Sequence, residues 1–337
     1  MLLLAPMQEV STLALWRTMA RHGGGPDVFV TEYFRVHANA RPDARILRSV
    51  TDDSLGKPVI AQMIGNNPKQ IAEMAKCLED AGAAGIDLNL GCPAPVVCGK
   101  KAGGALLRDP ALVREIVETL RPVVRGTLSL KTRVGFESPE EFPVLLDLFA
   151  DLPINALAIH GRTVKERYQS EVHVEEIAAA VDRLDCPVYA NGSVVSVASA
   201  EGMLRKTGAA GLMVGRGAIR NPWLFSQIRS SGTGSARPGL RDLHAYVAML
   251  YEEVAASGPS RASRSLCEAA HVHRMKKFMN YIASGIGEGR FQHEIRRAST
   301  GAEFWKICDR FLLTDAPLPG EPTADGRLFC GFESLAG

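Results

Sequence analysis

The stretch DLNLGCPAPVVCGKKAGGALL, from Asp87 to Leu107, combines several residue types that can do chemistry. Cys92 follows an apolar run, has an asparagine three residues before it, and precedes two lysines and a run of glycines. A cysteine in this setting could be a structural thiol, a metal ligand or a reactive thiol held over a bound cofactor. The choice depends on which other side chains the fold brings to it.

The cysteines and the composition narrow these alternatives. The seven cysteines are irregularly spaced, no CxxC is present, and neither a second cysteine pair nor nearby histidines accompany Cys92 and Cys98. We therefore expect no metal site, and reduced thiols in a cytoplasmic protein. The opening MLLLAP lacks a basic segment before it, and no apolar run approaches about 18 residues, so neither a signal peptide nor a membrane span is expected. The net charge of +2 neither requires nor excludes a nucleic-acid partner.

Short apolar runs alternate with helical patterns through the first two-thirds of the chain. Eight strands are predicted, at 2–6, 27–32, 58–64, 85–90, 127–134, 156–161, 187–192 and 211–216. The segment DPALVREIVETLR between two of them begins with an Asp cap and a proline in the first turn, as helices do. Eight strands alternating with helices predict a parallel (β/α)8 TIM barrel, with a doubly wound open sheet as the alternative.

The pattern changes after the eighth predicted strand. The segment 230–239 is rich in Gly, Ser and Pro, as linkers are, and helical periodicity alone follows it. We expect a barrel over 1–235, a small all-α domain over 240–315 and an irregular C-terminal tail over 316–337.

Polar residues stand at the ends of nearly all predicted strands, where the active site of such a barrel forms. Lys131 lies inside the apolar run LSLKTRV, and a buried lysine needs an anion or a strong acceptor. The other strand-end residues are Gln62, Asn89, Cys92, Arg133, His160, Asn191, Gly215 and Arg216. Such a set predicts a polar ligand over the barrel mouth.

The last two loops indicate what that ligand is. The segments ANGS (190–193) and GRG (215–217) follow strands seven and eight, where barrels often bind a phosphate through backbone N–H groups. Arg216 adds a charged donor, and Lys131 and His160 beneath a ring system suit flavin mononucleotide. Cys92 could then give a proton to one substrate carbon while the flavin reduces its neighbour. The reading of Cys92 as a small buried structural thiol stays open at this point.

The chain resembles the tRNA-dihydrouridine synthases over about residues 2–225. The matching motifs, in family order, are LLLAPM, AQMIG, DLNLGCPAPVV with AGGALL, KTRVGF, IHGRTVKERY, ANGS and VGRGAIRNPWLF. The resemblance implies a TIM barrel with FMN and NADPH as reductant, which reduces the C5–C6 bond of a uridine in tRNA. Such a uridine must leave the folded tRNA to reach a buried flavin.

The same resemblance implies roles for individual residues. It implies Cys92 as the group that protonates C5 from the face opposite the flavin, and Asn89 as a contact to the flipped uracil. The implied FMN contacts are Pro6, Met7, Gln8, Gln62, Lys131 and His160, with Asn191, Gly192, Ser193, Gly215 and Arg216 at the phosphate end.

Finer similarity points to the bacterial C-type branch, which modifies uridine 16 in the D-loop. TEYFRV (31–36), HVHRMKKFMNYI and FQHEIRR resemble stretches of that branch. The similarity implies tRNA contacts at Arg35, Tyr168, Arg274, Lys276 and Arg296, and basic residues gather in the helical region as a phosphate backbone requires. We expect a monomer with tRNA as its partner. Cys98 and the extended tail depart from the branch pattern.

Two other functions remain as alternatives. A barrel flavoenzyme acting on a small molecule, such as a dihydropyrimidine, would share the flavin site and need no basic helical region. A catalytically silent RNA-binding protein would retain the barrel and lose the flavin. Binding to tRNA at moderate salt and the flavin content distinguish the three.

Overall fold

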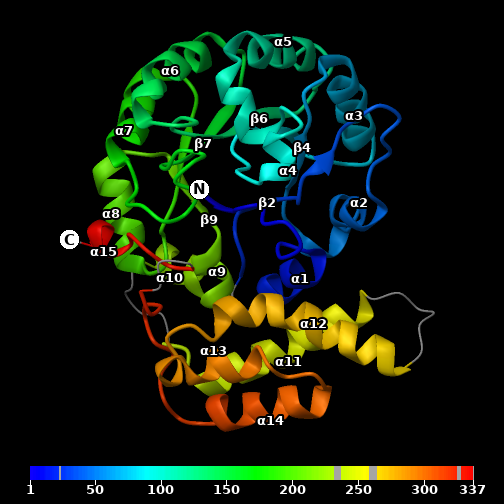
Figure 1. Ribbon diagram of the computed structural model, residues 1–337, viewed down its shortest axis with the longest axis vertical. Coiled ribbons are helices and arrows are strands. Elements are labelled where there is room, and N and C mark those ends of the chain that lie inside the picture. Colours follow the sequence, from blue (N-terminus) through cyan, green and yellow to red (C-terminus); the bar gives the residue numbers. More distant parts are fainter. Residues whose placement is uncertain (23, 231–236, 258–263, 325–327, 337) are drawn as a thin grey trace.

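A closed parallel barrel forms the larger part of the molecule (Figure 1). The computed structural model describes residues 1–22, 24–230, 237–257, 264–324 and 328–336, with the backbone alone at 264–267. The barrel strands, in order, are β1 (Leu2–Leu4), β2 (Val28–Val30), β4 (Val59–Ile64), β5 (Gly85–Asn89), β6 (Thr127–Arg133), β7 (Ala156–His160), β8 (Val188–Asn191) and β9 (Gly211–Val214). Each pairs in parallel with its neighbours, and β9 pairs with β1 to close the circle. The predicted barrel is confirmed, and the open sheet is wrong.

Helices surround the strands because their apolar faces pack on the barrel. Proline in the first turn and a capping side chain start several of them: Asn67 Oδ1 accepts from Gln70 N at 3.1 Å, and Asp109 Oδ1 from Leu112 N at 3.1 Å. The helices are α1 (Leu13–His22), α2 (Ala44–Val50), α3 (Pro68–Asp80), α5 (Pro110–Leu120), α6 (Phe142–Asp151), α7 (Val174–Arg183), α8 (Val197–Thr207), α9 (Arg216–Arg220) and α10 (Leu224–Arg229).

Some short elements were not predicted. Strand β3 (Phe34–Arg35) pairs with the end of β4 outside the barrel circle, and the one-turn helix α4 (Pro95–Cys98) follows the Gly-Cys-Pro loop. Short 3₁₀ helices occur at Asp53–Leu55, Gly103–Arg108, Pro139–Glu141 and Gly287–Gly289. These pieces are too short to show a periodicity in the sequence.

A helical region lies beneath the barrel in Figure 1. It consists of α11 (Leu240–Ala256), α12 (Arg264–Ile282), α13 (Arg290–Ile295) and α14 (Gly301–Leu312). Helix α11 packs against α1 and α12 packs against α9. Of the linker predicted at 230–239, residues 231–236 lie outside the described part of the chain. No helix of the described chain is long and apolar enough to cross a membrane.

Most of the C-terminal tail that the structure describes forms no helix or strand. It runs back from the helical region to the barrel and ends in α15 (Glu333–Ala336), which packs against α8 (Figure 1). A backbone bridge also joins Gly239 to Pro317. The tail therefore belongs to the folded body.

The strand register positions the polar residues. Arg133 pairs with His160, and His160 with Asn191, so three successive strands present polar side chains at the same level. Asn89 pairs with Lys131 on the neighbouring strands. Because all strands are parallel, these residues converge at one mouth of the barrel.

Candidate active site

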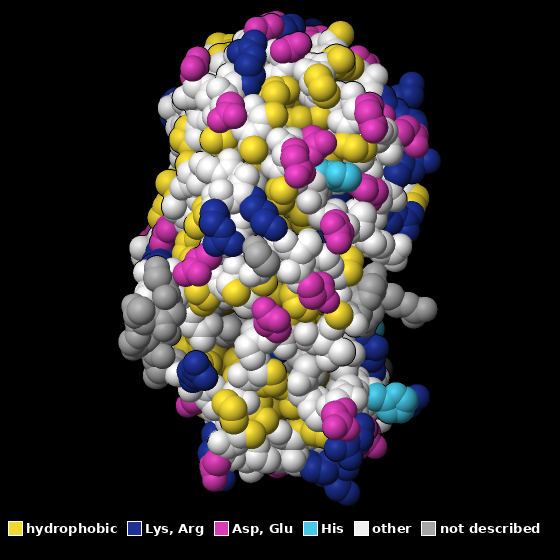
Figure 2. All heavy atoms as spheres, turned by 90° about the vertical axis from the view of Figure 1, so that its left-hand side faces the viewer, with side chains coloured by type: hydrophobic (Ala, Val, Ile, Leu, Met, Phe, Trp, Pro, Cys, Tyr) yellow, Lys and Arg dark blue, Asp and Glu magenta, His cyan; other side chains and the backbone are white. Residues whose placement is uncertain are grey.

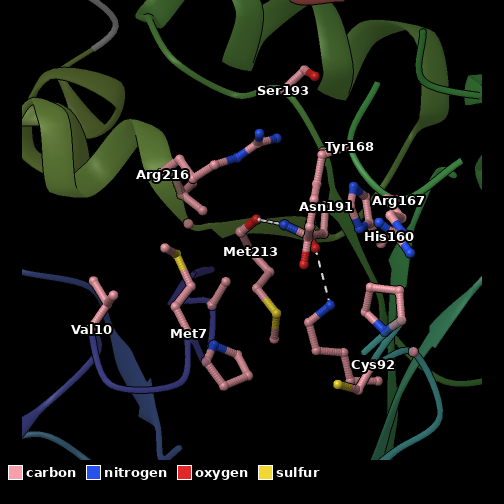
Figure 3. Close-up of a pocket in the computed structure, with 18 of the residues that line it drawn as sticks. Met7, Val10, Cys92, His160, Arg167, Tyr168, Asn191, Ser193, Met213 and Arg216 are labelled. Carbon is pink, nitrogen blue, oxygen red and sulfur yellow. Dashed lines mark hydrogen bonds between the residues drawn. The ribbon is translucent and has the colours of Figure 1, made fainter. Parts of the chain in front are cut away.

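A cavity of about 580 Å³ opens at the carboxyl ends of the barrel strands. This volume is in the range of small-molecule sites. Figure 3 shows Cys92 and Arg216 toward opposite ends of it. The predicted residues that line it are Pro6, Met7, Gln8, Asn89, Cys92, Lys131, His160, Tyr168, Asn191, Gly192, Ser193, Gly215 and Arg216.

Other predicted site residues do not line this cavity. Gln62 is fully buried below it, where its Nε2 donates to Asp87 and its Oε1 accepts from Asn89 Nδ2, both at 2.8 Å. Arg35 lies on β3, and Arg274, Lys276 and Arg296 lie in the helical region. Gln62 thus holds the side chain of Asn89 by a hydrogen bond, and it lies among the strands rather than among the loops that surround the cavity.

The side chain of Asn89 shapes the loop that holds Cys92. Its Oδ1 accepts from the backbone N–H groups of Gly91 at 3.1 Å and Cys92 at 2.9 Å. This explains an asparagine three residues before the cysteine, since its amide replaces a backbone acceptor in the turn. The Tyr33 hydroxyl lies beside the Cys92 thiol, and burial and that thiol raise the pKa of Tyr33.

The glycines after Cys92 pack directly against its loop. Gly104 N donates to Cys92 O at 3.1 Å, and a Cβ at Gly104 would lie 2.6 Å from Val164 Cγ2. Gly103 has a φ of +59°, and its added Cβ would lie 3.0 Å from the Cβ of Cys92. The AGG motif therefore lets the chain turn tightly behind the thiol.

Lys131 is held at the centre of the cavity by Asn191. Its Nζ donates to Asn191 Oδ1 at 3.1 Å, and Asn191 Nδ2 donates to Met213 O at 2.6 Å (Figure 3). Burial, and then the charge of Arg133, lower the pKa of Lys131 to about 8. A negative charge placed near Nζ would favour the ammonium form again.

Asp87, which the sequence analysis did not single out, lies beneath Lys131 in the barrel. Its carboxylate accepts from Gln62 Nε2 at 2.8 Å and from Ser129 Oγ at 2.7 Å. Burial raises its pKa from 3.8 to about 6 despite these hydrogen bonds.

Asp87→Asn should change how stability depends on pH. Between pH 4 and 6 the folded chain binds more protons at Asp87 than the unfolded chain, so the free energy of unfolding falls as pH rises through this window. In the Asn variant that fall should be smaller by up to about 1.4 kcal/mol per pH unit. Urea unfolding at pH 4.5 to 7 measures it, with the exposed Asp147→Asn as control. Parallel curves for wild type and Asp87→Asn would contradict the assignment.

His160 is a neutral donor in this environment. Burial, followed by the charges of Arg133, Lys131 and other arginines, holds its pKa well below its usual range. Arg162 Nη1 lies 3.3 Å from His160 Nε2. Because a guanidinium only donates, Nε2 must accept, which leaves the ring proton on Nδ1.

Cations line the cavity from the Cys92 loop, where Arg133 lies, to the opposite end, where Arg216 lies. The ring of Tyr168 lies between two of them, 5.2 Å from Arg133 Cζ and 5.0 Å from Arg216 Cζ. Arg133 donates to the carbonyls of Gly91, Thr163 and Arg167, so it also ties the loop after β5 to the loop after β7. None of the described residues that line the cavity is Asp or Glu. The cavity therefore attracts an anion, and Arg216 is a cation at the end away from Cys92.

The loops after β8 and β9 approach closely beside the cations. A Cβ at Gly217 would lie 2.2 Å from Val194 O, and Gly192 has a φ of +130°. Gln8 Oε1, on the opposite wall, is buried and has no hydrogen-bond partner in the described chain. Tight glycine loops, uncompensated cations and an unsatisfied acceptor together fit a ligand with a ring system and an anionic group.

Several lining residues were missed by sequence reasoning. Arg133 lines the cavity, as its predicted place at a strand end implies, while Tyr33, Tyr281, Leu328, Phe329 and Cys330 have no sequence signal that connects them to the site. The last three belong to the tail, which the sequence predicts as irregular. Their positions depend on contacts with residues more than a hundred positions away.

Comparison with known proteins places this cavity in context. A family model described as "Dihydrouridine synthase (Dus)" matches residues 3–308. Relatives include "tRNA-dihydrouridine synthase B" of Pseudomonas aeruginosa, 36% identical over 67% of this chain and 68% of that protein. "Probable tRNA-dihydrouridine synthase" of Rhodobacter capsulatus is 35% identical over 71% of this chain and 74% of that protein.

Solved structures are similar in fold alone. Histamine dehydrogenase from Rhizobium sp. 4-9 matches with a TM-score of 0.55 and 12% identity, over 91% of this chain and 61% of that one. A 2-naphthoyl-CoA reductase matches with a TM-score of 0.52 and 11% identity, over 68% of this chain and 50% of that one. The chain thus spans between half and two-thirds of these two structures.

Proposed function

We propose, because this chain belongs to the dihydrouridine synthase family, that it reduces the C5–C6 bond of a D-loop uridine in tRNA with FMN and NADPH. The observation that supports this most is the arrangement of one cavity, with the Cys92 thiol toward one end, Arg216 toward the other, and a described lining that holds Lys131 and Arg133 and no Asp or Glu. Such a cavity has room for a ring system between an anion site and a proton donor.

The residues present fit an FMN. Arg216, Ser193 and the glycine loops would hold its phosphate, and Met7 and Pro6 would contact the ring system. Bound and reduced, the flavin supplies the hydride that C6 of the uracil receives. Lys131 would stabilise negative charge at the N1/O2 edge of the ring, and that charge would in turn favour the ammonium form that burial disfavours.

Cys92 would donate the proton that completes the reduction. Its thiol gives a proton to C5 from the face opposite the flavin, and the resulting thiolate takes a proton from solvent before the next turnover. The neighbouring Tyr33 hydroxyl can donate to the thiolate in that interval. Asn89 accepts from the loop backbone through its Oδ1 and donates one N–H of its amide to Gln62. Its second N–H is left to donate to the uracil.

The tRNA would contact the helical region. Arg296 donates to Asn280 Oδ1, Arg297 to His293 O and Lys276 to Ala298 O, so their charges meet neutral acceptors. Lys277, by contrast, forms an ion pair with Glu9. Figure 2 shows charges of both signs interspersed over the barrel face that carries α8, and basic side chains gathered toward the helical end. The uncompensated charges there suit a phosphate backbone.

Replacing Arg296 and Arg297 together by alanine should weaken tRNA binding and leave the flavin in place. Both side chains are exposed, so the fold should not change. Plotting log K for tRNA against log salt should show a slope smaller by about 1 to 2 units. Arg114→Ala, on an exposed barrel helix, is the control. Equal tRNA affinity for both variants would place the interface elsewhere. Lys276, which holds Ala298 O, is a poorer probe.

The uridine at position 16 is the proposed target, from the resemblance to the C-type branch. The relatives described above are named as the B type or without a letter, so they do not support that branch. Dihydrouridine should be mapped in tRNA from cells without the gene and with it restored. Loss and recovery at position 16 would support both the reaction and the branch. Loss at position 17 or 20 would keep the reaction and overturn the branch, and no loss anywhere would overturn the proposed function.

A further inference from the structure

The end of the tail lies against the cationic end of the cavity. We call residues 328–336 the strap. In Figure 1 the tail leaves the helical region, passes the barrel mouth and ends in α15 beside α8. Leu328, Phe329 and Cys330 line the same cavity as Arg216 and Ser193.

Two arginines of the barrel donate to strap carbonyls. Arg216 Nη1 donates to Leu328 O at 2.5 Å, and Arg162 Nη2 donates to Cys330 O at 3.2 Å. Ser193 Oγ donates to the same Cys330 O at 2.8 Å. A carbonyl orients a guanidinium without neutralising it, so both side chains keep their full charge for an anion.

Apolar anchors hold the strap in place. Phe329 and Phe332 are 2% and 3% exposed and pack with Val195 and the ring of Tyr281. Leu335, 2% exposed, packs into the main core. Burying three such side chains is a substantial stabilisation, so the strap is a fixed part of the fold.

Helix α8 is adapted to receive the strap. A Cβ at Gly202 would lie 1.6 Å from Leu335 O, which no rearrangement of side chains could relieve. Glycine in the middle of a helix is otherwise less favourable than alanine. Lys206, one turn further along α8, donates its Nζ to Ser334 O. Glycine at position 202 therefore lowers the intrinsic stability of α8 and allows the close contact with the strap.

We propose that the strap is the outer wall of the phosphate end and that it slows the escape of bound FMN, with Leu328–Cys330 as cofactor-binding residues. This rests on the proposed function. The cavity of about 580 Å³ is present with Leu328–Cys330 among its lining residues, so the strap forms part of its wall without filling it. The bond to Leu328 O takes one of the five N–H donors of Arg216, and within the described chain the side chain makes no other hydrogen bond.

The test is the rate at which FMN leaves the holoenzyme. Three variants should release the strap: a chain ended after residue 324, the pair Phe329→Ala with Phe332→Ala, and Gly202→Ala. Gly320→Ala is the matched control, since a Cβ there meets nothing within 4 Å. The holoenzyme is mixed with an excess of an FMN-binding apoprotein that traps released FMN, or is passed through a gel-filtration column. The fluorescence of FMN then measures how much has left the enzyme. We expect release at least about tenfold faster in the three variants and unchanged in the control. Riboflavin, which lacks the phosphate, should be affected less than FMN.

Folding defects are separated from strap release by a double substitution. Gly202→Ala in the chain ended after residue 324 should add nothing to the release rate, because its Cβ then meets no strap. An added effect would mean that the substitution acts through α8 itself. Release rates equal to wild type in all three variants would overturn the proposal. Tighter FMN binding in the variants would also overturn it, because it would show that the strap competes with the phosphate. If the wild-type chain binds no FMN at all, the proposed function fails instead.

Discussion

Cys92→Ala should reduce tRNA reduction by about 10² to 10⁴-fold while FMN content and tRNA affinity stay at wild-type levels. The thiol is the proposed proton donor to C5, and alanine removes that proton without changing the loop. The hydrogen bonds that shape the loop use the backbone N–H of residue 92 and the side chain of Asn89, so the variant should keep its geometry. Single-turnover oxidation of the reduced flavin by tRNA measures the step directly.

Cys98→Ala is the matched control for Cys92. Its thiol donates to Cys92 O at 3.5 Å, and burial, then the nearby Cys92, raise its pKa. It is therefore a thiol of the same loop held in its protonated form, and its removal should change turnover by less than about threefold. Equal losses in both variants would mean that the loop, rather than the Cys92 proton, is needed. A wild-type rate for Cys92→Ala would remove it from the mechanism.

Arg216→Ala should lower the affinity for FMN by about 10 to 100-fold, as expected for one lost hydrogen bond to a charged group. The side chain lies at the end of the cavity where no carboxylate competes for an anion. Apoprotein titrated with FMN and, separately, with riboflavin gives the two constants by fluorescence. Riboflavin affinity should change little, because the contact is to the phosphate.

Arg229→Ala is a suitable control, since this arginine pairs with Asp27 on the outside of the barrel. Because Arg216 also holds Leu328 O, the same substitution belongs in the chain ended after residue 324. There it should still weaken FMN binding, since the phosphate contact does not need the strap. Equal losses for FMN and riboflavin would show that Arg216 acts through the fold alone.

The barrel could be predicted from sequence because its strands leave a regular signal. Parallel strands buried on both faces appear as short apolar runs, and each observed barrel strand falls within one of the predicted ranges. Strand β3 was not predicted because a strand of two residues cannot show a periodic pattern. The helices after the first strands were less clear in the sequence, and α2 is only seven residues long.

The site could be predicted only where a strand end supplies the side chain. Lys131, His160 and Asn191 follow from the strand order, since residues at the ends of parallel strands must converge. Gln62 is also near a strand end, yet it points into the layer with Asp87 below the cavity. The level of a side chain along the barrel axis depends on the strand register, which the sequence alone does not show. Whether each lining residue has its proposed role stays a prediction.

The tail could not be predicted because it accepts hydrogen bonds through its backbone carbonyls, which every residue has. Arg216 stands in a motif that suggests anion binding and Arg162 in a family motif, and nothing in either motif indicates Leu328 or Cys330. Gly202 also looks like an ordinary small residue in a helix until the strap is seen beside it. Contacts over more than a hundred residues leave no local pattern.

The closure of the barrel by β1 and β9 has a consequence for synthesis in the cell. Leu2 pairs with Leu212, so one edge of β1 has no partner until more than two hundred further residues have been made. At the usual speed of translation, about 5 to 20 residues per second, that edge waits about 10 to 40 s on the ribosome. An apolar strand with an open edge is a template for aggregation during such an interval. The nascent chain should therefore depend on chaperones, and slower or cooler expression should raise the soluble yield.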